Sequence, residues 1–290
     1  MVNSDVEIIC DGNNKIGLGH IRRSLTLFNQ LKKDNIEVSI SGISKESNLF
    51  LPENIPGKGK SKIKIYDLPI DSNFSFSENV FDESIIITLD HFGNFVPDYN
   101  IVVFAHKNPC AKEKVFTGLE YILLRKEVRL LSGSPEKIQD LSKVLVILGG
   151  SDLLNQGHEV AKKLTTMSYE VTLIQGPFAR NKSLSQDYEV LINPPNLPDL
   201  IKSAGWVVTN GGGSLFEAMY LGKAAIALPQ SKEELSIANY MLAKSAILGV
   251  GLDRIEHFES SEIKPIQLNA QSLIDGRGHE RIVKIVKDIL

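Results

Sequence analysis

Short apolar runs and amphipathic segments alternate along the first half of the chain. The run Val6–Cys10 is followed by a segment with apolar residues at Ile21, Leu25, Phe28 and Leu31, a spacing typical of a helix that packs one face. Further apolar runs at residues 37–43, 62–68, 84–89 and 101–104 predict strands. The run at 84–89 is apolar on both alternating faces, as in a buried parallel strand. This half therefore predicts a sheet covered by helices.

The same alternation begins again at Lys143. Strands are predicted at residues 144–148, 169–174, 188–192, 206–209 and 224–228, and helices near 158–167, 197–204 and 233–246. Two such halves predict an α/β protein with two doubly wound, Rossmann-like domains that face each other across a cleft. We expect domains at residues 1–137 and 138–276, with a hinge near 132–142. An amphipathic helix at 277–290 is expected to pack back on the first domain.

Length and composition are those of an ordinary globular protein. The 290 residues are 42% hydrophobic and 23% charged, enough for two cores. The net charge of −3 argues against a nucleic-acid-binding protein, and no apolar run approaches a membrane span. The first residues lack the features of a signal peptide, and Cys10 and Cys110 form no metal-spaced cluster. We therefore expect a reduced, cytoplasmic setting.

A turn containing two glycines lies between the first predicted strand and the first predicted helix. Gly17 and Gly19 allow the backbone to turn sharply, and the amides of the new helix favour an anion. His20 begins the helix beside Arg22 and Arg23, which suit phosphate. The turn lacks the Gly-Lys-Ser/Thr of a Walker A loop, and Arg22 replaces the third glycine of the dinucleotide fingerprint. His20 is either a functional group or a solvent-contacting residue at a helix end.

Polar residues follow the predicted strand at 84–89. Functional residues of α/β sheets lie just past the carboxyl ends of the strands, which makes Asp90 and His91 candidates. The alternatives are a loop-capping carboxylate for Asp90 and a partly exposed packing residue for His91. For His106, whose surroundings are less distinctive, a packing role is expected.

Three consecutive glycines precede a predicted helix in the second half. The cluster comprises Gly211, Gly212, Gly213 and Ser214, with Glu217 one turn further on. Glycine costs roughly 0.5–1 kcal/mol relative to alanine in regular structure, so such a run is expected where the backbone must approach another group. We expect Ser214 to cap the helix, the amides to bind a diphosphate and Glu217 to accept hydrogen bonds from ribose. The alternative is a tight turn with a capping serine.

Together, these motifs resemble one known group of proteins. Residues 11–23 are similar to the N-terminal signature of the UDP-sugar hydrolase of pseudaminic acid biosynthesis and of the related spore-coat polysaccharide proteins. Further matches in the same order are residues 90–93, 118–121 with 124–125, 149–152, 211–214 with Glu217, and 275–276. The matches span nearly the whole chain. The C-terminal half also resembles the nucleotide-binding half of MurG-like glycosyltransferases, which share the two-domain GT-B fold.

The resemblance implies a metal-independent hydrolase, without cofactors, that cleaves the bond between the anomeric carbon and the UDP oxygen. The family substrate is UDP-2,4-diacetamido-2,4,6-trideoxy-β-L-altropyranose, whose sugar is released with UDP for nonulosonic acid biosynthesis. His20 matches the catalytic histidine, the general base for water. The implied substrate-binding positions are Gly17, Gly19, Arg22, Arg23, Asp90, His91 and Phe92. The implied nucleotide-binding positions are Gly149, Gly150, Ser151, Gly211, Gly212, Gly213, Ser214 and Glu217.

Two places depart from the family pattern. The family usually has tyrosine where Phe92 stands, so a hydrogen bond to the sugar is lost. It commonly has Asn-Gln where Glu233 and Glu234 stand, and carboxylates beside a diphosphate repel it unless they face hydroxyls or solvent. Three alternatives therefore stay open: an enzyme for another amino-sugar nucleotide, a MurG-like transferase with a non-water acceptor, and a non-catalytic sugar-nucleotide-binding protein.

Overall fold

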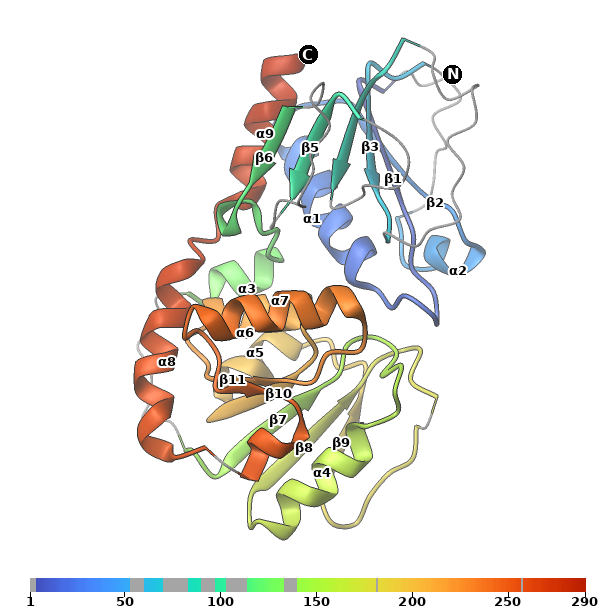
Figure 1. The fold of residues 1–290 in the computed structure, drawn as a ribbon. Helices are drawn as coiled ribbons and strands as arrows, with labels where there is room; N and C mark the ends of the chain where they lie inside the picture. Colours follow the sequence, from blue (N-terminus) through green and yellow to red (C-terminus); the bar gives the residue numbers. More distant parts are fainter. Residues whose placement is uncertain are drawn as a thin grey trace. The chain divides into compact units, whose positions relative to one another are not determined.

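The chain folds into two compact units, each built on a parallel sheet. The computed structural model describes residues 4–52, 60–69, 83–89, 97–102, 114–132, 140–180, 182–256 and 258–290. Unit 1 consists of Met1–Arg125 with Gly276–Leu290, and unit 2 of Lys126–Asp275 (Figure 1). Within the described ranges each unit holds a six-stranded sheet. The prediction of two Rossmann-like α/β domains is confirmed.

The sheet of unit 1 has the strand order β2-β1-β3-β4-β5-β6, and every neighbouring pair is parallel. The strands are β1 (Val6–Cys10), β2 (Val38–Gly42), β3 (Ile63–Asp67), β4 (Ile85–Leu89), β5 (Tyr99–Val102) and β6 (Lys114–Thr117). The helices are α1 (Gly19–Lys33), α2 (Lys45–Asn48) and α9 (Gly278–Ile289), with a 3-10 turn at Leu119–Tyr121. The central strands carry buried isoleucines such as Ile8, Ile65 and Ile87, as expected for a sheet enclosed by helices.

The C-terminal helix α9 is part of unit 1. Its apolar stripe, with Ile282, Val283 and Val286, is buried, and the helix packs against α1. At the end of α1, Asp34 Oδ2 lies 2.7 Å from Lys287 Nζ of α9. Helix α9 thus joins the core of unit 1 although the whole of unit 2 precedes it in the sequence.

The first boundary between the units lies between Arg125 and Lys126, earlier than the expected position at 137/138. Helix α3 (Lys126–Leu130) belongs to unit 2, where Lys202 Nζ donates a hydrogen bond to the Leu131 carbonyl. This contact is tertiary and leaves no mark in the local sequence pattern. Residues 133–139 of the expected hinge lie outside the described residues.

The sheet of unit 2 has the order β12-β11-β10-β7-β8-β9 and is also parallel throughout. Its strands are β7 (Lys143–Ile147), β8 (Glu170–Gln175), β9 (Glu189–Ile192), β10 (Trp206–Thr209), β11 (Ala225–Ala227) and β12 (Gly249–Val250). Its further helices are α4 (Gly157–Thr166), α5 (Leu197–Ser203), α6 (Gly213–Tyr220), α7 (Lys232–Ala243) and α8 (Ser260–Leu273), with a 3-10 turn at Leu252–Glu256. Trp206 lies fully buried in the core, edge-on to Tyr169 and Phe258.

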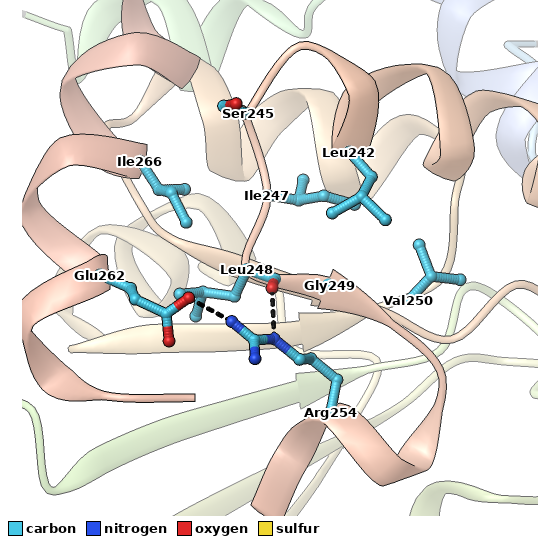
Figure 2. Close-up of a pocket in the computed structure, with 9 residues that line it drawn as sticks. All are labelled: Leu242, Ser245, Ile247, Leu248, Gly249, Val250, Arg254, Glu262 and Ile266. Atoms are coloured by element: carbon cyan, nitrogen blue, oxygen red, sulfur yellow. Dashed lines mark hydrogen bonds and ion pairs between the residues drawn. The ribbon is translucent and has the colours of Figure 1, made fainter. Parts of the chain in front are cut away.

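The edge strand β12 is held by one arginine. Arg254 Nε donates to the Leu248 carbonyl at 2.6 Å, and its Nη2 contacts the Glu262 carboxylate (Figure 2). A hollow beside this strand is lined mainly by aliphatic side chains, among them Leu242 and Ile266. None of the residues that line it belongs to the predicted site.

We predict that Ile282→Ala destabilises unit 1 selectively. The side chain is 1% exposed, and its truncation should lower the free energy of unfolding by about 2–5 kcal/mol. The matched control is Leu290→Ala, because Leu290 is 42% exposed and its truncation should cost less than about 0.5 kcal/mol. Urea unfolding followed by far-UV circular dichroism measures both changes. Fluorescence of Trp206, the one tryptophan of the chain, follows unit 2 separately. Equal losses in the two variants would contradict the placement of α9.

Candidate functional site

In each sheet the strand order reverses direction at one position, the topological switch point. In unit 1 the chain passes from β1 to β2 on one side and then to β3 on the other, and in unit 2 it passes from β7 to β8 and later to β10. Ligands of doubly wound sheets bind beyond the carboxyl ends of the strands at such a switch point. The predicted first turn follows β1, and the two predicted glycine turns of unit 2 follow β7 and β10.

The turn after β1 is shaped by two glycines. Gly17 has φ 72°, a left-handed conformation that favours glycine, and its amide donates to the Asn13 carbonyl at 2.8 Å. A Cβ at Gly12 would lie 2.3 Å from Ile21 Cδ1, so Gly12 lets the turn pack on α1. Gly19 has open space where a Cβ would be. In this turn glycine is therefore required at position 17 by the backbone conformation and at position 12 by the packing against Ile21.

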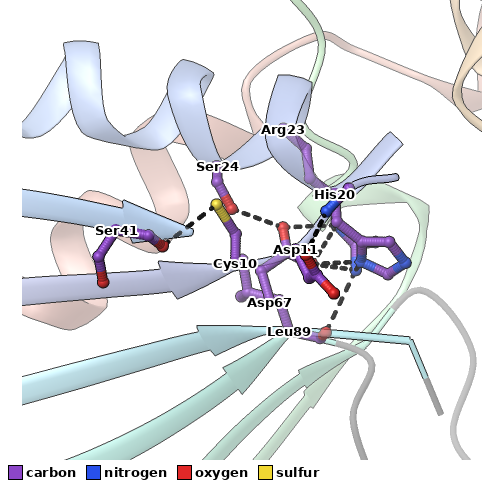
Figure 3. A network of polar contacts seen from close by, with 9 residues as sticks. Cys10, Asp11, His20, Arg23, Ser24, Ser41, Asp67 and Leu89 are labelled. Atoms are coloured by element: carbon purple, nitrogen blue, oxygen red, sulfur yellow. Dashed lines mark hydrogen bonds and ion pairs between the residues drawn. The ribbon is translucent and has the colours of Figure 1, made fainter. Parts of the chain in front are cut away.

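At the switch point of unit 1, His20 meets a buried carboxylate. His20 Nδ1 lies 2.7 Å from Oδ1 of Asp67, the last residue of β3 (Figure 3). Arg23 Nε donates to both oxygens of Asp67, at 2.8 and 2.9 Å, and Ser24 Oγ donates to Oδ2 at 2.9 Å. All three partners come from the first turns of α1. The carboxylate is fully buried and saturated with donors.

These contacts define the tautomer of His20. A proton on Nδ1 completes the hydrogen bond to Asp67, whereas a lone pair there would face the carboxylate at 2.7 Å. Arg23 Nη2 also lies 3.1 Å from Nδ1, but it donates to Asp67 Oδ1 at 2.5 Å. In the neutral imidazole a proton on Nδ1 leaves Nε2 with a lone pair, and no described residue hydrogen-bonds to Nε2. The His20 side chain is 21% exposed, so a ligand or water can reach part of the imidazole.

The charge balance keeps Asp67 ionised. Burial raises the pKa of this carboxyl, but the Arg23 guanidinium and His20 outweigh it and lower the pKa to about 2. The same burial, with the negative charge of Asp67 nearby, raises the pKa of the Cys10 thiol to about 12. Cys10 is thus a protonated packing residue of β1.

The remaining predicted residues of unit 1 are only partly placed. Arg23 Nη2 donates to the Leu89 carbonyl at 3.2 Å, which links the network to the end of β4. Asp90, His91 and Phe92 follow directly and lie outside the described residues, as does His106. Arg22 is half-buried on α1, and its role as a ligand contact stays a prediction.

Sequence reasoning missed Asp67. Its signal was present, because Asp67 ends an apolar strand in the same way that Asp90 follows one. Ser24 was missed as well, since a serine inside a predicted helix has no distinctive pattern. Only the pairing of β1 with β3 brings Asp67 opposite Cys10 and beside α1.

In unit 2 the two predicted glycine turns lie together. Strands β7 and β10 are neighbours, and a Cβ at Gly149, whose φ is 74°, would lie 3.2 Å from Asn210 Nδ2. Ser151 is buried beside this turn. Asp152 precedes α4, and its carboxylate accepts the amides of Gln156, the N-cap residue, and of Gly157 at 3.0 and 2.8 Å. Helix α6, in contrast, has no side-chain cap and no acidic residue in its first turn.

In the glycine cluster before α6, packing within the protein requires glycine at position 211. A Cβ at Gly211 would lie 2.2 Å from the backbone oxygen of Glu234, so only glycine at this position allows the first turn of α7 to pack this closely. A Cβ at Gly213 would meet open space. Ser214 does not cap the helix as expected, because α6 begins at Gly213 with Gly212 as its N-cap, which leaves Ser214 inside the first turn. Glu217 is buried in the middle of α6, and its role toward ribose stays a prediction.

Glu234 places a carboxylate inside this turn. Asn210 Nδ2 donates to Oε1, and the Gln230 amide donates to Oε2 at 2.7 Å. Burial raises the pKa of Glu234 even though hydrogen bonds from Gln230, Asn210 and the Gly211 amide lower it. These donors are neutral groups, in contrast to those around Asp67.

Two further properties concern the described residues alone. Within them no three His, Cys, Asp or Glu side chains come together as metal ligands would. A search of the same residues finds no helix with the length and apolar character that spanning a membrane requires.

Similarity to solved structures gives the class of fold. MurG of Acinetobacter baumannii has a TM-score of 0.61 at 12% identity, with 98% of this chain and 99% of that chain covered. A Staphylococcus aureus MnaA–UDP co-structure has a TM-score of 0.62 at 12% identity, with 98% and 97% covered. The chain therefore has the two Rossmann-like domains of GT-B proteins.

Similarity at the level of sequence is found with a few curated proteins. No protein-family profile matches the chain. It is 25% identical over 274 residues to an uncharacterised protein of Methanocaldococcus jannaschii. It is 23% identical over 287 residues to the Helicobacter pylori pseudaminic acid cytidylyltransferase and UDP-2,4-diacetamido-2,4,6-trideoxy-β-L-altropyranose hydrolase, and 23% identical over 199 residues to the Bacillus subtilis spore coat polysaccharide biosynthesis protein SpsG.

These alignments cover 78%, 93% and 61% of this chain and 56%, 53% and 59% of the three relatives. The chain thus spans about half the length of the curated relatives it matches. The resemblance to the hydrolase and to the spore-coat proteins, predicted from the motifs, is confirmed as a similarity of sequence.

We predict that Asp67→Asn lowers the free energy of unfolding at pH 7 by about 3–5 kcal/mol, because it leaves the Arg23 charge without its partner. Folding lowers the pKa of Asp67 from 3.8 to about 2, so its ionised form stabilises the native protein above pH 3.8. This contribution is lost as the pH falls from about 4 to about 2, and the difference in stability between the two proteins should then become smaller.

Urea unfolding at a series of pH values measures this difference. The matched control is Asp5→Asn, because Asp5 pairs with Lys62 at the surface of the same unit and the change should cost about 1 kcal/mol or less. A difference between Asp67→Asn and the unaltered protein that stays constant down to pH 2 would contradict the charge assignment.

Proposed function

We propose that the chain is a UDP-sugar-processing enzyme and, specifically, a hydrolase of a UDP-linked amino sugar. The observation that carries this proposal is the contact between His20 Nδ1 and Asp67 Oδ1 at 2.7 Å. A histidine held in this tautomer by a buried carboxylate has its second nitrogen ready to accept a proton. The similarity to the Helicobacter pylori hydrolase supplies the reaction and the class of substrate.

In the proposed reaction, water attacks the anomeric carbon of the sugar. Its proton passes to His20 Nε2 as the new carbon–oxygen bond forms. The bond between the anomeric carbon and the diphosphate oxygen breaks, and the electron pair leaves with UDP. Asp67 stabilises the imidazolium that results, and Arg23 and Ser24 hold Asp67 in place. The products are UDP and the free sugar.

Unit 2 is proposed to bind the nucleotide. Its switch point brings together the turns after β7 and β10, and the amides at the start of α6 have no side-chain cap. Free amides and the dipole of a helix N-terminus favour phosphate and stabilise the charge on the departing diphosphate. The proposed substrate is UDP-2,4-diacetamido-2,4,6-trideoxy-β-L-altropyranose or a close analogue, by similarity to the Helicobacter pylori protein.

A second candidate function is transfer of the sugar to an acceptor other than water. The observation in its favour is the similarity of the fold to MurG and to other glycosyltransferases. The same base would then deprotonate a hydroxyl group of the acceptor. Turnover in water alone separates the two functions.

We predict that His20→Asn lowers the rate of turnover by at least about 100-fold, because proton removal in the transition state is lost. The dissociation constant for UDP should change little, since a base contributes more to the transition state than to binding. The matched control is His158→Asn, because both ring nitrogens of His158 already have partners, Tyr188 at 2.7 Å and Gln175 at 2.8 Å. If binding and rate fell equally in His20→Asn, His20 would be a ligand contact rather than a base.

The function itself is tested with a panel of UDP-amino sugars in water that carries heavy oxygen, with a metal chelator present. NMR and mass spectrometry follow UDP and the free sugar. Hydrolysis at the anomeric carbon leaves UDP without the label. Labelled UDP would mean attack at phosphorus and would overturn the proposed reaction. Tight binding without turnover, followed by turnover once an alcohol or lipid acceptor is added, would favour the transferase.

A further inference from the structure

The turn that precedes α6 already contains an anion supplied by the protein. Glu234 lies in the first turn of α7 and directs its carboxylate into this turn, where Oε1 meets Asn210 Nδ2. A Cβ at Gly212 would lie 3.1 Å from the same Oε1. The carboxylate therefore occupies space beside the backbone that leads into α6.

Glu234 also engages donors that a phosphate would need. The Asn210 side chain and the Gly211 amide both hydrogen-bond to it, and the Gln230 amide fixes its other oxygen at 2.7 Å. A diphosphate at the start of α6 would meet this carboxylate within a few ångströms, where two negative charges repel each other strongly. The neighbouring Glu233 is exposed, so water screens its charge.

Resting on the nucleotide site proposed for unit 2, we propose that Glu234 is a specificity-determining residue that competes with the diphosphate for the turn at residues 210–213. Its carboxylate lowers the affinity for UDP and has no such effect on the uncharged nucleoside. The nucleotide binds in one of two ways. Either the Glu234 side chain first breaks its hydrogen bond to Asn210, or the diphosphate contacts only the backbone amides at the start of α6. Charge at this position thus sets the affinity of the nucleotide site.

The test compares Glu234→Gln with Glu233→Gln, since each removes one negative charge from adjacent positions of α7. A glutamine at 234 retains the shape of the glutamate, and its oxygen can accept the Gln230 amide. The side chain of Asn210 can rotate to present its oxygen to the new amide nitrogen. Circular dichroism checks the fold, and Glu234→Ala provides a second neutral variant. Calorimetry at pH 8 then measures the binding of UDP and of uridine to the full chain.

We expect Glu234→Gln to bind UDP about tenfold more tightly than the unaltered protein, which corresponds to about 1.4 kcal/mol. Glu233→Gln should bind UDP within about twofold of the unaltered protein, because its charge is screened. The affinity for uridine should be the same in the unaltered protein and in both glutamine variants. Raising the salt concentration should reduce the gain in Glu234→Gln only modestly, since the carboxylate is half-buried and held by hydrogen bonds from the protein.

Other outcomes overturn this inference in different ways. Equal affinity for UDP in all proteins would overturn the role of Glu234 and leave the nucleotide site standing. Weaker binding of both UDP and uridine to Glu234→Gln would make Glu234 a direct ligand contact. If none of the proteins bound UDP, the nucleotide site of the proposed function would fall, and the competition with it.

Discussion

The organisation of unit 1 depends on one buried carboxylate. Asp67 ends β3 at the switch point of the sheet and accepts hydrogen bonds from three side chains of α1. An ionised group without solvent is tolerated only where its charge is balanced and its lone pairs are used. Arg23 supplies the charge, Ser24 fills a further lone pair, and His20 completes the set. The same contacts that make Asp67 acceptable in the core also orient the imidazole.

Unit 2 also contains a carboxylate that is held by hydrogen bonds at a switch point, but its partners differ from those of Asp67. Glu234 also lies at a switch point, but Asn210 and the Gln230 amide, which hold its carboxylate, are neutral. Burial therefore raises the pKa of Glu234, whereas cationic partners lower that of Asp67. One carboxylate is stabilised as an anion and holds a histidine by a hydrogen bond. The other lies where the sequence predicts a phosphate, so its charge opposes the ligand proposed for that turn.

The glycines show how function and packing overlap at such turns. Gly211 makes room for the backbone of Glu234, and Gly12 makes room for Ile21. Gly19 and Gly213 meet open space, so packing alone does not account for them. A run of glycines read from a sequence thus contains positions that packing within the protein requires and positions that it does not. Only the contacts of each residue separate the two kinds.

The sequence alone determined the alternation of strands and helices, because apolar periodicity records which faces are buried, and the predicted strands agree with the observed ones within one or two residues. It also placed His20 at the start of α1. It did not reveal β6, four residues at a sheet edge, or α8, whose hydrophobic periodicity is weak. The partners of His20 and of the glycine turn were decided by tertiary structure. Asp67 is 47 residues from His20, and Glu234 is 24 residues from Asn210. Such pairs leave no local pattern, since strand order and helix packing, not spacing along the chain, bring them together.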